Sequence, residues 1–201
     1  MFLIKNLLLP NQKLINWQWD GTPTHLQGPN GVGKSLFLQA IASLYPVSFD
    51  AFHFDEKSRD LINPQLYRSQ VIYLSSQLSM SSYETAHDFY MAPLKLQIYK
   101  NHIYPSDLIL QLNEWGLLEK RCSELSSGEK QVLNLLRALS LKPRVLLMDE
   151  ALSNLDVTRK DWILSFIHQK YESNDLTYIL VSHEPSPTPY LNQVNFSELL
   201  C

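Results

Sequence analysis

Short apolar runs that end in polar residues recur along the chain, and they predict the strands of a buried sheet. Three such runs span residues 71–74, 145–148 and 176–181. Their continuous apolar character is typical of parallel strands that helices cover on both faces. The polar residues after each run should therefore gather at one edge of the sheet, where folds of this kind bind their ligands.

Helical periodicity fills the segments between these runs. Residues 36–45 carry apolar side chains at helical spacing and stop before a proline. Residues from about 78 to 143 are expected to be mainly helical, with Ser106 capping one helix and another starting near Gly128. Asp156 can cap a further helix. Strands alternating with helices predict an α/β fold with a parallel sheet.

Composition narrows the classes of function. The chain has 201 residues, which suits one domain, and its net charge of −3 gives no basic surface for nucleic acid. No apolar run approaches the roughly 20 residues that span a bilayer, so direct membrane insertion is not expected. Cys122 and Cys201 lack metal-ligand spacing and favour a reducing compartment. We therefore expect a cytoplasmic protein whose first residues form a strand and are not a signal peptide.

A glycine-rich loop carries the first chemical signal. It follows a β-type stretch, precedes an amphipathic helix and fits the phosphate-binding pattern of a Gly, four residues and Gly-Lys-Ser: Gly28, Pro29, Asn30, Gly31, Val32, Gly33, Lys34 and Ser35. Glycines let the backbone N–H groups wrap around phosphate, and the following helix adds its positive dipole end. Lys34 is expected to pair with the β- and γ-phosphates and the Ser35 hydroxyl to bind Mg²⁺, so ATP or GTP binding is predicted.

Paired carboxylates follow the strand predicted at 145–148. Asp149 is expected to hold Mg²⁺, and Glu150 is placed to act as general base toward the attacking water. Gln77 and His183 each follow another apolar run and should reach the same edge of the sheet. Taken alone, each of these two polar residues is more often a solvated loop residue than a functional one.

The segment 125–131 changes that judgement. Its sequence Leu-Ser-Ser-Gly-Glu-Lys-Gln resembles the signature sequence of ABC (ATP-binding cassette) ATPases, usually Leu-Ser-Gly-Gly-Gln. The phosphate loop, Gln77, this segment, the paired carboxylates, a stretch at 153–156 similar to the family's D-loop and His183 then occur in the family's order. The resemblance covers the chain almost end to end. It implies one domain over 1–201: a P-loop NTPase with an ABC-type core, an N-terminal antiparallel β subdomain and a helical subdomain, about 78–143, inserted in the core.

The resemblance also implies roles for residues outside the phosphate loop. Gln77 would contact Mg²⁺ or the attacking water, and His183 would contact the γ-phosphate. Ser126, Gly128 and Glu129 would face the ATP that a second copy of the chain holds. That arrangement agrees with the physics of a helix N-terminus, which attracts phosphate. Two copies would therefore close head-to-tail over two ATP molecules, and Asp156 would communicate between the two sites.

Some positions depart from the family's pattern. Ser127 replaces a glycine, Glu129 stands where glutamine is commonest and Ala151 replaces a proline. No aromatic residue lies where the family commonly stacks adenine. Three aromatic residues near the N-terminus could substitute, although packing in the core is their more usual role: Phe2, Trp17 and Trp19.

Several kinds of ABC protein remain to be separated. In SMC- and Rad50-like ATPases long coiled coils divide the two halves, whereas here residues 36–124 join the phosphate loop to the signature-like segment. Translation-factor members have two cassettes and basic linkers, and this sequence shows neither feature. The compact layout resembles the ATPases of small bacterial exporters or of cytochrome c biogenesis. The resemblance implies a homodimer that binds a separate transmembrane subunit at the cytoplasmic face of the inner membrane. The alternative is a soluble ATPase that drives a regulatory or assembly partner.

Overall fold

The computed structural model describes residues 1–182 and 191–201. Its larger sheet is parallel and has the strand order β6-β7-β8-β3-β9. These strands are β3 (Thr24–Gln27), β6 (Val71–Ser75), β7 (Val145–Asp149), β8 (Thr177–Val181) and β9 (Asn192–Asn195). The three buried strands predicted from apolar runs are thus confirmed as β6, β7 and β8.

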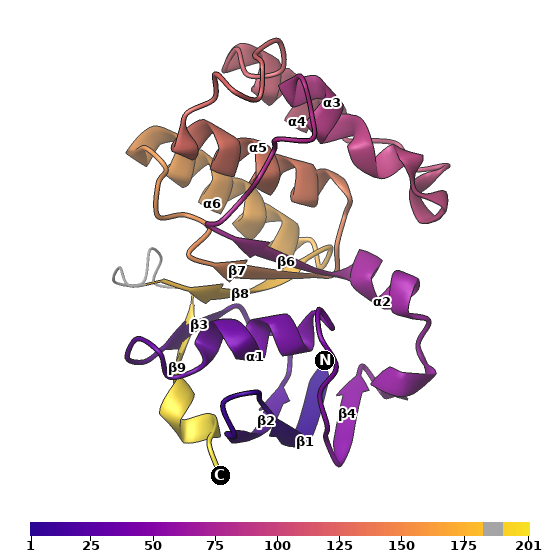
Figure 1. Ribbon diagram of the computed structural model, residues 1–201, viewed down its shortest axis with the longest axis vertical. Helices are drawn as coiled ribbons and strands as arrows, with labels where there is room; N and C mark the ends of the chain where they lie inside the picture. The colour runs from indigo at the N-terminus through magenta and orange to yellow at the C-terminus, as the bar shows by residue number, and fades with distance from the viewer. Residues whose placement is uncertain (183–190) are drawn as a thin grey trace.

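The smaller sheet is antiparallel and has the order β2-β1-β4-β5. Its strands are β1 (Phe2–Leu8), β2 (Leu14–Trp19), β4 (Ala51–Phe54) and β5 (Lys57–Ser58). The antiparallel N-terminal unit that the sequence implied is therefore present. Helix α1 (Lys34–Ile41) lies between the two sheets (Figure 1), and its Phe37 ring packs edge-on against Trp17 of β2 at 5.4 Å between ring centroids.

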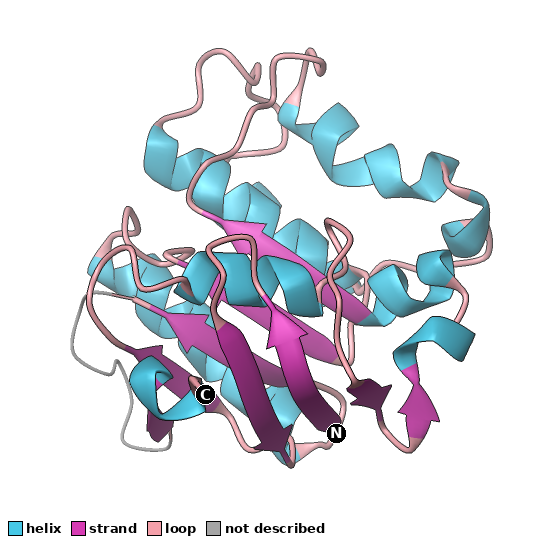
Figure 2. Ribbon diagram, turned by 60° about the horizontal axis from the view of Figure 1, so that its bottom comes forward, coloured by secondary structure: helices cyan, strands magenta, loops and turns pink. Residues whose placement is uncertain are grey.

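Helices cover the other face of the parallel sheet (Figures 1 and 2). Two long helices, α5 (Ser127–Ser140) and α6 (Val157–Glu172), pack directly on it. Along the chain, the segment between β6 and α5 contains α3 (Ala86–Met91) and α4 (Ser106–Glu114). The remaining helical segments are short: α2 (Pro64–Gln70), η1 (Arg59–Leu61), η2 (Ala92–Lys95), η3 (Gln97–Tyr99) and η4 (Phe196–Leu199). No helix among the described residues is long and apolar enough to cross a membrane.

Side chains alternate strictly between the two faces of the parallel sheet. Along β7, Leu146 and Met148 pack toward α5 and α6, whereas Val145 and Leu147 pack toward α1 and the antiparallel sheet. The same period of two continues to Asp149, which therefore falls on the α1 face. The strand pattern thus decides on which side of the sheet the first carboxylate emerges.

Two predicted helix boundaries were wrong. The helix expected over 36–45 ends at Ile41, because Ser43 adopts a left-handed conformation (φ 56°) and the Leu44 N–H bonds back to the Gln39 carbonyl, which closes the helix as a Schellman-type turn. Ser106 does not cap α4: it is the first helical residue, and Pro105 stands at the cap position without a side-chain bond. The predicted cap at Asp156 is confirmed, since its side chain accepts the Arg159 N–H.

Candidate functional site

Residues 28–33 join β3 to α1, and the phosphate-binding pattern continues over the first two residues of that helix. Gly28, Gly31 and Gly33 all have positive φ, of 147°, 72° and 113°. A Cβ at Gly33 would lie 2.9 Å from the Asn11 side-chain nitrogen, so the end of that flexible side chain would have to shift. These conformations are accessible to glycine and strained for other residues. The loop is braced from outside, because the Lys13 ammonium donates to the Val32 carbonyl at 2.9 Å.

The Lys34 ammonium lies inside this loop. It donates to the carbonyls of Gly28 and Pro29, at 2.7 and 2.9 Å. Burial lowers the pKa of Lys34, and the nearby carboxylates of Glu150 and Asp149 act against that shift. The lysine is thus a largely enclosed cation that faces two acidic groups.

A cleft of about 330 Å³ brings the loop and the paired carboxylates together. Lys34 and Ser35 line it from the loop side, and Asp149 and Glu150 line it from the end of β7. Asn30 and Gly31 also face the cleft, and both are exposed to solvent. Residues more than a hundred positions apart in sequence therefore meet at the carboxyl edge of the sheet, as the pattern of apolar runs predicted.

Asp149 is the buried member of the carboxylate pair. It is 7% exposed, and the Tyr73 hydroxyl donates to its Oδ2 atom at 2.8 Å. The Gln39 side-chain amide on α1 donates in turn to the Tyr73 hydroxyl at 3.1 Å. Burial raises the pKa of Tyr73 above its ordinary value. The phenol therefore stays protonated and links α1 to the carboxylate at the end of β7.

Glu150 adopts a left-handed backbone conformation, with φ 54°. Its N–H bonds to the Val181 carbonyl of β8 at 2.9 Å. Its own carbonyl accepts hydrogen bonds from the Gln131 side-chain amide and the Ser153 hydroxyl, both at 2.9 Å, and from the Ser153 N–H at 3.3 Å. A glutamate with positive φ is uncommon, and bonds to β8, to α5 and to Ser153 in the following turn hold it in place.

Gln131 of α5 connects this turn to the segment 153–156. Its amide nitrogen donates to the Glu150 carbonyl, and its amide oxygen accepts the Asn154 N–H at 3.2 Å. Gln131 is 5% exposed, and both bonds are partly buried. Gly128 permits this close packing, because a Cβ at that position would lie 2.5 Å from the Asn154 carbonyl oxygen.

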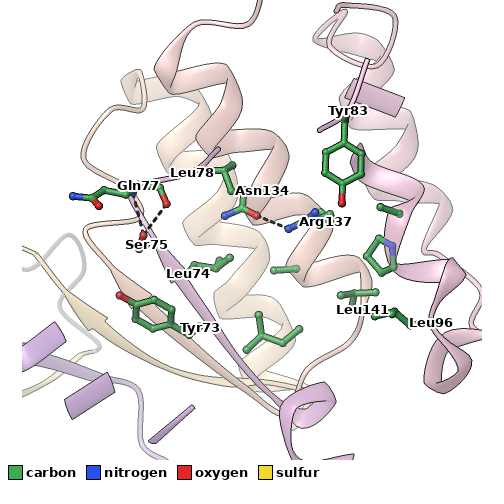
Figure 3. A pocket seen from close by; sticks show the side chains of 14 residues that line it. Tyr73, Leu74, Ser75, Gln77, Leu78, Tyr83, Leu96, Asn134, Arg137 and Leu141 are labelled. Carbon is green, nitrogen blue, oxygen red and sulfur yellow. Dashed lines mark hydrogen bonds between the residues drawn. The ribbon is translucent and has the colours of Figure 1, made fainter. Parts of the chain in front are cut away.

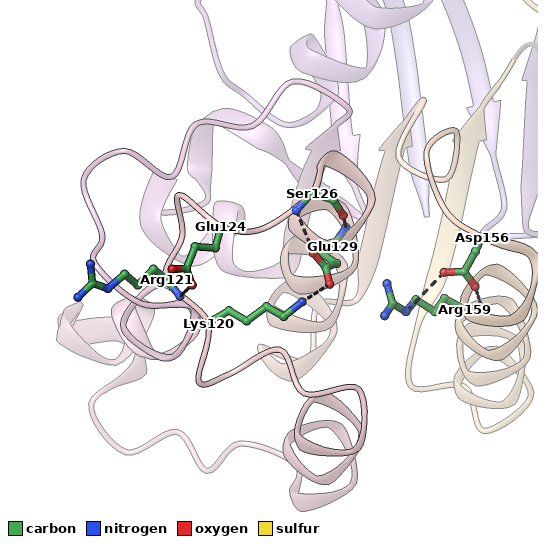
Figure 4. A network of polar contacts seen from close by, with 7 residues as sticks. All are labelled: Lys120, Arg121, Glu124, Ser126, Glu129, Asp156 and Arg159. Carbon is green, nitrogen blue, oxygen red and sulfur yellow. Dashed lines mark hydrogen bonds and ion pairs between the residues drawn. The ribbon is translucent and has the colours of Figure 1, made fainter.

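The signature-like segment forms the N-terminus of α5 (Figure 4). Ser126 caps the helix by accepting the Glu129 N–H at 3.2 Å, and the Glu129 carboxylate accepts the Ser126 N–H at 2.9 Å, which is a capping box. Lys120 donates to the same carboxylate at 2.6 Å. The Lys120 hydrogen bond, followed by that of the Ser126 backbone, lowers the pKa of Glu129 to about 2. Figure 4 also shows the Asp156 carboxylate turned to Arg159 of its own helix.

Gln77 lies outside the cleft described above. It follows β6 by two residues, and its N–H bonds to the Ser75 hydroxyl. Gln77 is among the residues that line a groove between β6, α5 and the segment around η2 (Figure 3). Its expected contact with Mg²⁺ remains a prediction. His183 falls outside the described residues.

Phe2, Trp17 and Trp19 are all buried in the core around α1. The interpretation of these rings as core residues is confirmed, and none of them is available to stack on adenine.

Comparison with known proteins decides the family. A sequence profile of the family described as ABC transporter matches residues 18–153. The chain belongs to this ABC transporter family. Within it, the chain is 30% identical to the probable iron export ATP-binding protein FetA of Escherichia coli (strain K12), over 84% of this chain and 76% of FetA.

Other ABC proteins show the same relationship. The chain is 33% identical to the molybdenum import ATP-binding protein ModC of Rhodopseudomonas palustris (strain BisB18), over 80% of this chain but only 43% of ModC. A putative ABC transporter ATP-binding protein from Pyrococcus furiosus has the same fold, with a TM-score of 0.76 at 17% identity over 100% of this chain and 99% of that one. This ABC protein is therefore an ATP-binding, ATP-hydrolysing transporter subunit.

Two residues of this ABC site were not anticipated from the sequence. Tyr73 was seen only as part of an apolar strand, and Gln131 only as part of the signature-like segment. The signal for Gln131 was available, because a glutamine among the apolar positions of a helix must find polar partners when it is buried. Nothing in the sequence pairs Tyr73 with Asp149, since that contact depends on how two strands align.

Proposed function

We propose that this subunit hydrolyses Mg-ATP as a head-to-tail homodimer. In this dimer two copies of the chain close over two nucleotides and drive a separate membrane subunit. One observation carries the dimer: the N-terminus of α5 is exposed at Ser126 and Ser127, and neither residue is among those lining the chain's own nucleotide cleft. A helix N-terminus attracts phosphate. Its exposed position is suited to the ATP of a second copy, to which Ser126, Gly128 and Glu129 would contribute.

The donor set in the cleft fits Mg²⁺. A hydroxyl (Ser35) and a carboxylate (Asp149) face the same space, and Mg²⁺ prefers a few protein oxygens completed by phosphate and water. Among the residues that the structure describes, no group of three or more His, Cys, Asp and Glu forms a closed metal cage, which agrees with such an open site. When bound, Mg²⁺ would neutralise charge on the phosphates.

The residues of the chain then divide the remaining work. Lys34 would exchange its bonds to the loop carbonyls for bonds to the β- and γ-phosphates, within the same loop. Glu150, fixed by its turn at the mouth of the cleft, would accept a proton from the attacking water. His183 would contact the γ-phosphate and Gln77 would link the cleft to the groove beside it. Asp156 would connect the two sites of the dimer.

The groove shown in Figure 3 is the proposed docking place for the membrane subunit. It has a volume of about 500 Å³ and lies between β6, α5 and the segment around η2. Leu96 is 56% exposed at its rim, while Arg137 and Asn134 supply polar groups from α5. An apolar rim beside a cation suits an amphipathic helix that carries a carboxylate. Through such a partner the subunit would sit at the cytoplasmic face of the inner membrane.

The experiment for the dimer uses Glu150→Gln. The variant should bind ATP but hydrolyse it at least a hundredfold more slowly, because general-base catalysis contributes about 10²- to 10⁴-fold. With ATP and Mg²⁺ it should elute as a dimer in size-exclusion chromatography with light scattering, and with ATP and EDTA as a monomer. Lys34→Ala provides the control, since it should neither retain tight ATP binding nor dimerise.

Two results would contradict the proposal. Hydrolysis by Glu150→Gln at the wild-type rate would show that another group is the base. A monomer at every ATP concentration, with ATP demonstrably bound, would remove the head-to-tail dimer. The soluble alternative makes the same dimer prediction and is separated by the partner: a transporter subunit should co-purify with an integral membrane protein, whereas a regulatory ATPase should not.

A further inference from the structure

The Tyr73 side chain forms a hydrogen bond with Asp149, the carboxylate that is proposed to bind Mg²⁺. Its hydroxyl donates to Asp149 Oδ2 at 2.8 Å, and Asp149 is 7% exposed. Hydrogen bonds to a charged acceptor are about twice as strong as those between neutral groups. The bond therefore restricts rotation of the carboxylate, and it occupies one of the two carboxylate oxygens, Oδ2.

The geometry that creates this contact lies in the sheet. Tyr73 pairs with Leu147 in the β6–β7 register, and both side chains face α1. Asp149 faces the same side two residues further along β7, so the long phenol reaches it diagonally. Gln39 of α1 then donates to the phenol oxygen at 3.1 Å, which fixes the ring from the helix that carries the phosphate loop.

We propose that Tyr73 is a positioning residue for the divalent cation: through its hydrogen bond it orients the Asp149 carboxylate toward the metal of the nucleotide cleft, and Gln39 orients Tyr73. The inference rests on the proposed role of Asp149 as a metal ligand. Partners behind a metal ligand fix its orientation, and their loss typically weakens metal binding by about 10- to 100-fold. The Gln39–Tyr73–Asp149 chain thus couples the helix after the phosphate loop to the metal-binding edge of the sheet.

The test measures metal binding directly with Mn²⁺ as a paramagnetic substitute for Mg²⁺. Electron paramagnetic resonance titrations of the whole chain, in the presence of a non-hydrolysable ATP analogue, give the Mn²⁺ dissociation constant. Tyr73→Phe removes only the hydroxyl and should raise that constant about tenfold or more. Gln39→Met should raise it less, because the phenol remains. In steady-state assays Tyr73→Phe should require more Mg²⁺ for half-maximal activity, with kcat nearly restored at saturating Mg²⁺.

Tyr67→Phe is the matched control. Tyr67 is another tyrosine next to α1; it is fully buried, whereas Tyr73 is partly buried, and its hydroxyl donates to the Ile41 carbonyl at 2.6 Å, away from the cleft. Its substitution should lower stability by a similar amount and leave the Mn²⁺ constant unchanged. A purely structural role for Tyr73 predicts that both variants behave alike, with wild-type metal affinity, and that result would overturn the inference.

Asp149→Asn separates failure of this inference from failure of the proposed function. If Asp149→Asn weakens Mn²⁺ binding and Tyr73→Phe does not, Asp149 is the ligand and the positioning role of Tyr73 is wrong. If neither substitution changes the Mn²⁺ constant, the metal assignment itself is wrong, and the inference falls with it.

Discussion

Glu129 shows at the scale of one residue how a departure from the family's pattern is accommodated. Glutamine is the common residue at this position, and the sequence suggested that a carboxylate here lies close to a nucleotide on a second copy. In the structure the charge is already engaged by the Ser126 N–H and by Lys120. The carboxylate is 14% exposed and therefore acts first as part of the helix cap.

This arrangement predicts a pH dependence of stability. The folded-state pKa of Glu129, about 2, lies below its ordinary value, so the stabilisation is present above that ordinary value and is lost as the pH falls toward 2. Glu129→Gln retains a capping side chain but has no charge to lose. The difference in unfolding free energy between wild type and Glu129→Gln, measured by urea denaturation, should be largest at pH 7 and shrink below about pH 4.5.

Glu124→Gln gives a control from the turn that precedes α5. Glu124 makes one longer contact, 3.4 Å from the Arg121 N–H, so the corresponding difference should be smaller. A Glu129→Gln difference that stays constant from pH 7 to pH 3.5 would show that the Lys120 pair does not stabilise the fold.

Single residues also show how far the sequence could be interpreted. The phosphate-loop pattern could be located from the sequence because its eight residues are consecutive, and its binding of phosphate stays a prediction. Core packing was the favoured interpretation of Trp17 and Trp19, and the structure confirms it, although the sequence left adenine stacking open as an alternative. Gln77 lies two residues beyond the end of β6 at Ser75, and it lines the groove. The sequence alone does not show at which residue this strand ends.

At the scale of elements, α5 links the signature-like segment to the proposed general base. The helix begins at the exposed cap and, one turn later, Gln131 bonds the turns that contain Glu150 and Asn154. These two partly buried hydrogen bonds would carry a movement of α5 to both turns. The sequence could place these three segments in order, but their contact required the packing of α5 on the sheet.

Gln131→Met tests that link by keeping the volume and removing both hydrogen bonds. The Asn154 N–H would lose its partner, at a cost of about 1–3 kcal/mol of stability, whereas the Glu150 carbonyl would keep its bonds from Ser153. We expect kcat for ATP hydrolysis to fall at least tenfold while the ATP dissociation constant, measured by calorimetry, changes little. Asn134→Met on the same helix is the control, because its described bond is to Arg137. A Gln131→Met variant that is destabilised but retains wild-type kcat would show that the link serves stability alone.

At the scale of the whole molecule, two separate regions of the helices are proposed to contact two different partners. The capped end of α5 carries the proposed dimer contact, and the groove beside η2 carries the proposed membrane-subunit contact. α5 contributes to both, since Arg137 lines the groove and Ser126 begins the helix. The fold class could be predicted from alternating strands and helices, whereas the groove could not, because residues from three separate segments line it.

Leu96→Asp tests the groove as a docking surface. The charge should repel the proposed carboxylate-bearing helix and remove apolar contact, so co-purification with the membrane subunit should be lost. ATP hydrolysis by the isolated chain should remain within about twofold, because exposed positions away from the site contribute little. Ile103→Asp is the control: Ile103 is 82% exposed in the same segment but does not line the groove. Equal loss, or equal retention, of the partner by both variants would contradict the docking assignment.

The left-handed turn at Glu150 has a consequence for which residues this position can accept. Its backbone favours glycine, asparagine or aspartate, whereas the proposed chemistry needs a carboxylate on the longer glutamate side chain. Local conformational preference and chemistry therefore select for different amino acids at the same position. The bonds from β8, α5 and Ser153 offset a strain of order 1–3 kcal/mol. A substitution that removes any one of these three contacts would therefore first change which residues are tolerated at position 150.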